Sequence, residues 1–298
     1  MTISLSALII TIICSVLWGA FDGIRKHLTA KASLISILFY LSLGFSLFFL
    51  IAMLLEGVPE WNSAYLIPGL LTILFNAAAN FFYIKAIAIS PISNTVPFLA
   101  FTTLFTAFTG FIFLGETLTW IQILGVIILV GASLIINGEL KKTGSLKAEI
   151  KSLWHSFVKE KGAHLMILVS FLWALSAPFD KIAVNAMSIT SHGFIESLAI
   201  TFIYFIYLAM NKELNCLKEG KRVPIFLGLG SFVYCGALAL QFYAYQLMKV
   251  SVFESVKRGF ALFTAIAISM IFFKEKITKL KLIGISLIVF GGALILNG

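Results

Sequence analysis

Charged side chains stand inside stretches of sequence that are otherwise apolar. Glu254, Lys257 and Arg258 lie within one such stretch, and Asp180 and Lys181 lie at the end of another. An ionised side chain at the centre of a membrane-spanning helix costs roughly 2.5–3.5 kcal/mol on insertion scales. We therefore expect these groups to face the interior of a helix bundle, where opposite charges neutralise each other.

Two pairings of these charges are open. Glu254 and Arg258 are four residues apart, so on a helix they form a neighbouring ion pair that can be a permanent part of the structure. Alternatively, Asp180 pairs with Lys257 or Arg258 in one state of the protein and separates from it in another, which would make the pair an external gate. Exchanging the charges of both partners should restore activity only if this gate exists.

Amides and tyrosines recur on one face of two further segments. Residues at i, i+4 and i+7, or at i, i+7 and i+11, share one side of an α-helix. Single groups of this kind commonly form hydrogen bonds between helices, worth on the order of 0.6 kcal/mol each. As two complete faces they favour the lining of a cavity. The two sets are Asn76, Asn80 and Tyr83, and Tyr234, Gln241 and Tyr245.

His192 and Glu196 are also four residues apart, near the start of an apolar segment. They either carry a coupling proton or form an interfacial pair at the helix end. The remaining histidines are scattered, and the sequence contains neither a phosphate-binding glycine loop nor a paired-histidine zinc motif. We therefore expect no catalytic residues, no metal site and no cofactor, in a protein that is not an enzyme.

The composition shows what surrounds these polar groups. Of the 298 residues, 60% are apolar and 12% are charged, and the mean hydropathy is +1.03. Soluble proteins carry roughly 45–50% apolar and about 25% charged residues. One water-soluble core cannot bury so much apolar sequence. The composition therefore excludes a soluble enzyme, a disulfide scaffold and a disordered chain, and predicts an all-α integral membrane protein.

Ten uncharged runs are candidates for membrane-spanning helices. A spanning helix needs about 20 mostly apolar residues, because unpaired backbone groups cannot be left in hydrocarbon. The polar, lysine-rich stretch 139–162 divides the runs into two halves of five, and is either a solvated linker or a short amphipathic helix at the interface. The runs are 3–21, 32–55, 64–84, 92–114, 119–138, 163–179, 190–210, 224–247, 252–273 and 282–297.

The formal net charge of +9 reflects an uneven distribution of cations along the chain. Of the 22 lysines and arginines, 18 fall in alternate connections, namely those after the first, third, fifth, seventh and ninth runs. Short loops rich in lysine and arginine mark the cytoplasmic side of a membrane protein. We predict that these connections are cytoplasmic and both termini external, in a multi-pass protein of the cell (inner) membrane. The cations then report sidedness, and no nucleic-acid partner is expected.

The two halves resemble each other in sequence. When residues 113–138 are aligned with residues 272–298, Glu116 matches Glu275 and both segments end in Asn-Gly. Because each half has an odd number of helices, the halves must be inverted relative to one another in the bilayer. Inverted repeats of this kind are typical of secondary transporters. Glycines in the fifth and tenth helices favour close packing, either within the chain or in a homodimer.

A family resemblance is carried by residues 89–119, ISPISNTVPFLAFTTLFTAFTGFIFLGETLT, and by their degenerate copy at residues 249–278, KVSVFESVKRGFALFTAIAISMIFFKEKIT. With Trp18 and Trp173 in the first helix of each half, these segments resemble the EamA-like branch of the drug/metabolite transporter superfamily. The resemblance covers nearly the whole chain.

The resemblance implies two EamA-like five-helix repeats, at residues 1–138 and 163–298, joined by the cytoplasmic linker 139–162. It also implies a central cavity between the halves and transport by alternating access. It leaves the substrate open, because the family handles amino acids, nucleotide-related metabolites, sugars and drugs. The three charges of the ninth helix depart from the first repeat, which argues against a purely hydrophobic drug.

Inverted symmetry sorts the polar residues into a central layer and two outer ones. We expect the central residues to bind the substrate, with aromatic rings enclosing it and amides orienting it. The outer residues are expected to act as gates or in coupling. The expected binding residues are Trp18, Asn76, Asn80, Tyr83, Trp173, Tyr234, Gln241 and Tyr245. The expected gate or coupling residues are Asp22, Lys85, Asn94, Asp180, Lys181, Glu254, Lys257 and Arg258.

These patterns favour a secondary transporter that moves a small polar or zwitterionic metabolite, such as an amino acid. Fixed charges of both signs near the gates suit a charged substrate, because a neutral apolar solute gives them no differential role. A proton or a counter-substrate drives transport in this interpretation. One alternative is a broad efflux pump for lipophilic cations, which would require unpaired carboxylates in the cavity. Another is an intramembrane enzyme or sensor. The sequence is compatible with both a monomer and a homodimer.

Overall fold

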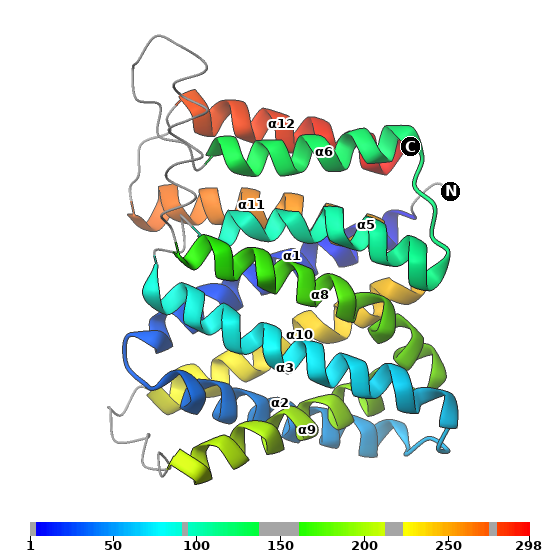
Figure 1. Ribbon diagram of the computed structural model, residues 1–298, viewed down its shortest axis with the longest axis vertical. Coiled ribbons are helices and arrows are strands. Elements are labelled where there is room, and N and C mark those ends of the chain that lie inside the picture. The colour runs from blue at the N-terminus through cyan, green and yellow to red at the C-terminus, as the bar shows by residue number, and fades with distance from the viewer. Residues whose placement is uncertain (1–3, 91–94, 137–160, 212–222, 274–278) are drawn as a thin grey trace.

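The computed structural model describes residues 4–90, 95–136, 161–211, 223–273 and 279–298, with side chains described for these except residues 97, 134, 136 and 262–281 (Figure 1). The order of its helices confirms the expected all-α fold, because the described residues form ten α-helices, five in each half. The first half contains α1 (Leu5–Thr29), α2 (Leu34–Glu56), η1 (Ser63–Tyr65), α3 (Leu66–Ile89), η2 (Val96–Ala100), α5 (Phe101–Leu114) and α6 (Trp120–Ile136). The second half contains α8 (Lys161–Ala186), α9 (Ile189–Asn211), α10 (Val223–Leu247), α11 (Val250–Phe273) and α12 (Lys279–Asn297).

Helix α1 continues well beyond the apolar run predicted for it. It includes Arg25 and Lys26, which we expected in a connecting loop, and ends at Thr29. The expectation was wrong because Arg25 pairs with Asp22 on the same helix, so the charges need not leave the bundle. Lys85 likewise lies inside α3 rather than in the connection that follows it.

The fourth crossing is built from two pieces, where run 92–114 predicted one continuous helix. The 3₁₀ turn η2 leads directly into α5. Pro97 lies in the first turn of η2, where its missing N–H is tolerated because that group has no helical partner. At the other end of α5, Gly115 adopts a left-handed φ of 64° and its N–H bonds to the carbonyl of Phe111 at 3.1 Å. Glycine takes this conformation without a steric penalty.

The two halves interlock through helix pairs that inverted symmetry relates. Helix α3 packs along α8, and the equivalent pair, α10 and α1, also packs together. In the same way α5 packs on α8 and α11 packs on α1. Helix α2 packs on its own equivalent α9, and α6 packs on α12. The core therefore lies between the halves, and a cavity there draws its walls from both.

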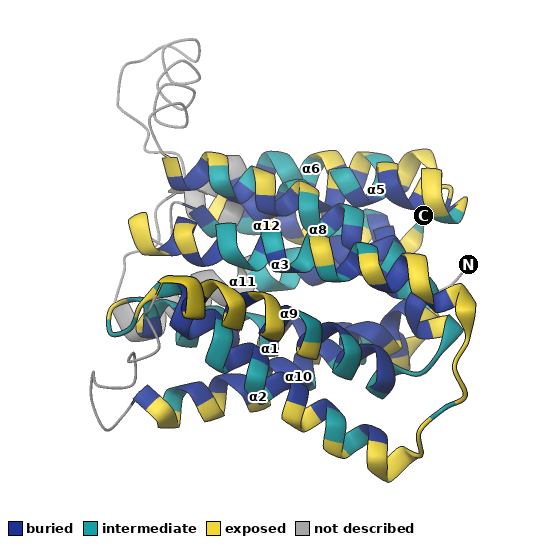
Figure 2. Cartoon of the chain, turned by 60° about the horizontal axis from the view of Figure 1, so that its bottom comes forward, coloured by how far each residue is buried: buried dark blue, intermediate teal, exposed yellow. Residues whose placement is uncertain are grey.

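The outside of the bundle is apolar, as a lipid-facing surface requires. Figure 2 shows exposed residues on the outer sides of the helices and buried ones toward the interior. Trp120, Leu55 and Met210 are among the large exposed apolar side chains. Within the described residues, six helices are long and apolar enough to cross a membrane, and three shorter apolar helices accompany them. Both termini lie at one end of the bundle, called the terminal end below (Figure 1).

Helices α6 and α12 approach closely at two glycines. A Cβ atom on Gly125 would lie 2.7 Å from the carbonyl oxygen of Gly291 and 2.7 Å from Cγ1 of Ile295. Among the described residues, a Cβ atom on Gly131, also on α6, would meet nothing within 4 Å. Gly125 and Gly291 therefore serve a contact within the chain.

Replacing Gly125 by valine is expected to destabilise the protein by about 1–3 kcal/mol, the usual effect of overpacking a core. The measurement is the unfolding temperature of the detergent-purified protein. Gly131→Val adds the same side chain to the same helix in open space and should leave stability nearly unchanged. Equal losses in both variants would show that helix propensity, not the α6–α12 contact, decides the result.

Candidate functional site

A cavity lies between helices of both halves. It encloses about 430 Å³ of non-atom space, part of it open to the outside, of which about 20 Å³ is accessible to the centre of a water molecule. One buried water needs roughly 10–15 Å³ by the latter measure, so the cavity is narrow in this conformation. The polar lining comes from Arg25, Ser42, Asn80, Glu196 and Ser197, and the aromatic lining from Phe21, Phe45, Tyr204 and Tyr234.

Arg25 is the basic group of this cavity. Its side chain is only 2% exposed and pairs with Asp22, one turn earlier on α1. Its Nη1 lies 3.4 Å from Oδ1 of Asn80. The guanidinium carbon lies 3.7 Å from the centre of the Tyr83 ring and 4.4 Å from that of Phe21, which is cation–π geometry. Arg25 Nε has no hydrogen-bond partner among the described residues, so the guanidinium keeps an unused donor.

Sequence reasoning missed Arg25 as a site residue because it counted the side chain among the loop cations. The signal was present in the spacing of Asp22 and Arg25, which stand at i and i+3 and so neutralise each other on a helix. A pair of this kind allows a helix to continue through an apolar environment beyond its last uncharged residue.

A second polar network joins α10 and α11. Gln241 Nε2 donates to the hydroxyl of Tyr245 at 3.0 Å, and that hydroxyl donates to Glu254 Oε1 at 2.9 Å. Lys257 Nζ donates to the same Glu254 oxygen at 2.5 Å and to Gln241 Oε1 at 2.9 Å. The expected pair of Glu254 with Arg258 is longer, at 3.9 Å. Lys257 is therefore the close partner of Glu254.

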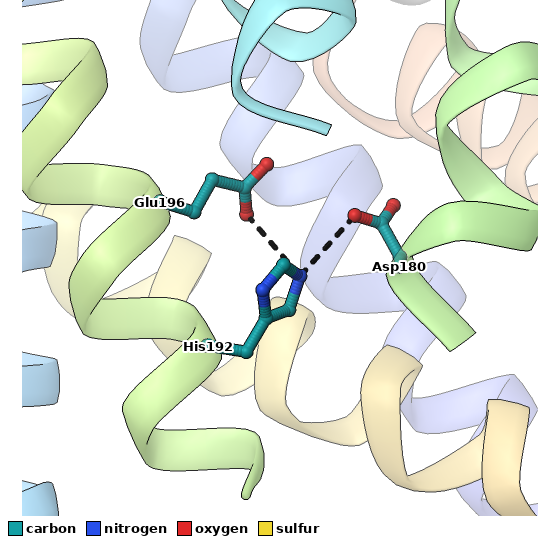
Figure 3. Close-up of side chains that lie close together, drawn as sticks. All are labelled: Asp180, His192 and Glu196. Carbon is teal, nitrogen blue, oxygen red and sulfur yellow. Dashed lines mark hydrogen bonds and ion pairs between the residues drawn. The ribbon is translucent and has the colours of Figure 1, made fainter. Parts of the chain in front are cut away.

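Asp180, His192 and Glu196 form a third cluster near the terminal end (Figure 3). His192 Nε2 lies 3.3 Å from Asp180 Oδ1 and 4.0 Å from Glu196 Oε2. The side chains of His192, Asp180 and Glu196 are 0%, 5% and 4% exposed. The interpretation of His192 and Glu196 as an interfacial pair is therefore wrong, because both are buried inside the bundle.

Polar side chains from three other places complete this cluster. The hydroxyl of Tyr65, in η1, lies 3.0 Å from His192 Nδ1. Ser176 Oγ donates to Asp180 Oδ2 at 3.0 Å. Asn76 Nδ2, on α3, donates to the remaining carboxylate, that of Glu196, at 2.5 Å, and to the Ser176 hydroxyl at 2.7 Å. The cluster thus ties α3 to α8 and α9.

The predicted gate pair is not formed in this conformation. Asp180 is engaged with His192, and in the described part of the chain neither Lys257 nor Arg258 lies within ion-pair distance of it. Lys181, the neighbour of Asp180, pairs instead with Glu116 at 3.1 Å.

Glu116 joins the two halves at the terminal end, and sequence reasoning missed it as a site residue. One carboxylate oxygen accepts hydrogen bonds from Lys181 Nζ at 3.1 Å and from the backbone N–H of Val250 at 2.9 Å. The other accepts from the backbone N–H of Ser251 at 3.3 Å and from its hydroxyl at 3.1 Å. These N–H groups belong to the first turn of α11, which has no helical acceptors for them. The match of Glu116 with Glu275 in the repeat was the signal available.

Replacing Glu116 by alanine is expected to destabilise the protein by about 1–3 kcal/mol. The change leaves buried N–H groups without an acceptor and removes a negative charge from a helix N-terminus. Thermal unfolding in detergent measures it. Glu60→Ala, which removes an exposed carboxylate, is the control and should have little effect. An unchanged unfolding temperature for Glu116→Ala would contradict the assigned role.

The structure gathers most of the predicted site residues without putting all of them on the cavity. Of the expected binding residues, Asn80 and Tyr234 line it. The Trp18 ring lies 5.4 Å from that of Tyr234, and the Trp173 ring lies 5.5 Å from that of Tyr83. The other three form parts of the networks above. Of the expected gate residues, Lys85 is exposed on α3, and Asn94 lies outside the described residues.

Comparison with known proteins agrees with this architecture. A family model described as the EamA-like transporter family matches residues 5–138 and again residues 160–297. One solved structure, described only as "Crystal structure of protein", superimposes with a TM-score of 0.70 at 14% sequence identity, covering 98% of each chain. At that identity the likeness concerns the fold alone. Comparison with curated proteins gives no match.

Proposed function

Because the chain belongs to the EamA-like transporter family, a branch of the drug/metabolite transporter superfamily, it is a multi-pass membrane transporter; we propose that its substrate is a small zwitterionic metabolite, an amino acid or a related compound. Alternating access moves the substrate from one side to the other. The observation that carries the proposal is that Arg25 and Glu196, groups of opposite charge, line the same cavity.

The two charged groups suit the two ends of an amino acid. A guanidinium holds a carboxylate through charge-assisted hydrogen bonds, and a carboxylate holds an ammonium group in the same way. Asn80 adds an amide, and Phe21, Phe45 and Tyr234 supply the apolar wall that a side chain requires. Fixed charges of opposite sign in a water-poor cavity discriminate a zwitterion from neutral solutes.

The narrowness of the cavity fits a transporter between its open states. A cavity with room for one or two water molecules must widen before a substrate enters it. The symmetry-related helix pairs α3 with α8 and α10 with α1 allow the same movement to open either end. Asp180 with Lys257 or Arg258 remains a proposed gate pair, which forms in a state other than this one.

A lipophilic organic cation is the second candidate substrate. Glu196 favours it, because within the described chain this cavity carboxylate lies within ion-pair distance of no lysine or arginine. Arg25 opposes it, because a second cation in the same cavity would be repelled. The two candidates therefore differ in whether the substrate needs a carboxylate.

Counterflow in proteoliposomes tests the proposal. The purified protein is reconstituted, loaded with one unlabelled solute and challenged with its radiolabelled form, across a panel of amino acids and their decarboxylated amines. Exchange of amino acids but not of the matched amines is the expected result. Exchange of the amines and of quaternary ammonium compounds alone would favour the second candidate, and no exchange of any solute would overturn the proposal.

The orientation proposed from the lysine-rich connections completes this function. It places the terminal end outside the cell and the opposite end in the cytoplasm, following the distribution of lysine and arginine. Labelling of single cysteines introduced at Glu60, at the terminal end, and at Lys31, at the opposite end, distinguishes the two orientations. Labelling of the Lys31→Cys variant from outside intact cells would reverse the assignment.

A further inference from the structure

The cluster of Asp180, His192 and Glu196 holds two acidic groups and no permanent positive charge. In the described part of the chain, neither carboxylate has a lysine or arginine within ion-pair distance. Moving an ionised carboxylate out of water is unfavourable by several kcal/mol unless it is paired. The single imidazole can balance at most one of the two carboxylates.

The nearest cations already have carboxylate partners. Lys181 pairs with Glu116 at 3.1 Å, and Lys257 pairs with Glu254 at 2.5 Å. Across the cavity, Arg25 is paired within its own helix. These side chains therefore do not compensate the charge of the cluster.

The other titratable groups around the cluster are hydroxyls and an ion pair. Tyr65 contacts His192 from η1. Tyr234 and Tyr245, on α10, interact electrostatically with the carboxylates of the cluster. From α11, Glu254 and Lys257 act on Asp180 with opposite signs. Helix α3 contributes the neutral amide of Asn76. Among the described neighbours, none adds a net positive charge.

Hydrogen-bond donors are divided unequally between the two carboxylates. Asp180 faces the hydroxyl of Ser176 at 3.0 Å and His192 Nε2 at 3.3 Å. Glu196 accepts from Asn76 through Oε1, whereas its Oε2 lies 4.0 Å from His192 Nε2, beyond hydrogen-bond distance. Among the described residues no group donates a hydrogen bond to Glu196 Oε2, so this oxygen is open to a proton.

We propose that the Asp180–His192–Glu196 cluster is a proton-binding site that couples proton movement to transport, with the exchangeable proton on Glu196. The inference rests on the proposed function and assigns its coupling ion. Glu196 belongs both to this cluster and to the cavity wall that contains Arg25. A proton and a substrate ammonium group therefore compete for the carboxylate oxygens of Glu196.

The exchange is balanced in charge and atoms. In the absence of substrate, one proton from water binds the Glu196 carboxylate, giving a neutral carboxyl. When the substrate ammonium group arrives, the O–H bond breaks, the proton passes to water and the carboxylate pairs with the ammonium. No other bond changes. One proton thus leaves for each substrate molecule bound, which makes the protein a proton–substrate exchanger.

Infrared difference spectroscopy tests the site without any substrate. The purified full chain is titrated between about pH 5 and pH 8, a range in which an exposed glutamate stays ionised. Acidification of the wild-type protein should produce a C=O stretching band of a protonated carboxyl group, and Glu196→Gln should remove it. The control Glu60→Gln, which removes an exposed carboxylate, should keep the band. A band that persists in Glu196→Gln, or that disappears only in Asp180→Asn, would overturn the assignment.

Transport driven by a pH gradient tests the coupling. Since one pH unit is worth 1.36 kcal/mol, exchange of one proton for one substrate should support about tenfold accumulation of the exchanged amino acid per pH unit. Counterflow without accumulation would overturn the proton coupling and leave the proposed function standing. Conversely, a Glu196 band in a protein that exchanges no member of the panel would defeat the proposed function alone.

Discussion

Replacing Arg25 by methionine is expected to raise the KM for an amino acid by about 10- to 100-fold. A hydrogen bond to a charged group contributes about 1.5–3 kcal/mol, and each 1.4 kcal/mol is tenfold in affinity. Methionine retains an unbranched apolar side chain among Phe21 and Tyr83, whose rings contact the guanidinium. Initial rates of amino-acid exchange measure the effect.

A purely structural effect would also raise the KM, because Arg25→Met leaves Asp22 without its partner. A second variant distinguishes this effect from lost substrate binding. The double variant Asp22→Asn/Arg25→Met removes both charges, with an isosteric change at Asp22 and an unbranched side chain at Arg25. If Arg25 binds the substrate carboxylate, the double variant stays impaired for the amino acid. Recovery of the wild-type KM in the double variant would show that Arg25 only neutralises Asp22.

Replacing Lys257 by methionine is expected to destabilise the protein by about 3–5 kcal/mol, the effect of removing one partner of a buried ion pair. Glu254 would remain in the interior, with its nearest remaining cation, that of Arg258, at 3.9 Å. Gln241 Oε1 would also lose the hydrogen bond of 2.9 Å that it accepts from the Lys257 ammonium group. Unfolding in detergent measures the loss.

The double variant Glu254→Gln/Lys257→Met separates a static pair from a moving one. Replacing both members of a buried pair by uncharged groups is often neutral for stability, so the double variant should unfold near the wild-type temperature. Normal transport by that stable variant would show that the pair is structural. Loss of transport by that variant, together with transport by a separate Asp180→Lys/Lys257→Asp variant, would support the proposed gate.

The charged residues show where sequence reasoning reached its limit. The sequence correctly predicted that the ninth helix carries interior charges, and Glu254 and Lys257 are buried. It favoured Arg258 as the partner of Glu254 because i,i+4 neighbours share a helix face. The closer partner is Lys257 at i+3, whose ammonium group also donates to Gln241 on α10. A contact with another helix decided between two spacings that are almost equivalent on one helix.

Residues that act between the halves were the least predictable. Glu116 lies in a short connection, and its partners on α8 and α11 are distant in sequence. His192 and Glu196 show the helical spacing of a pair, but spacing alone does not distinguish an interfacial pair from a buried one. Their contact with Asp180 exists only because α8 and α9 meet around Asn76 of α3.

The sequence by itself determined the membrane setting, the ten helices and the inverted repeat. Each of these follows from local periodicity, run length and the match between halves, because hydrocarbon tolerates no unpaired backbone and so imposes helices of one length on any sufficiently apolar run. Only the tertiary structure decided which charges are partners and which polar residues reach the cavity. Those choices depend on distances of a few ångströms between helices far apart in sequence. Packing between the helices brought Arg25 and Glu196 to the cavity wall and Glu116 to the junction of the two halves.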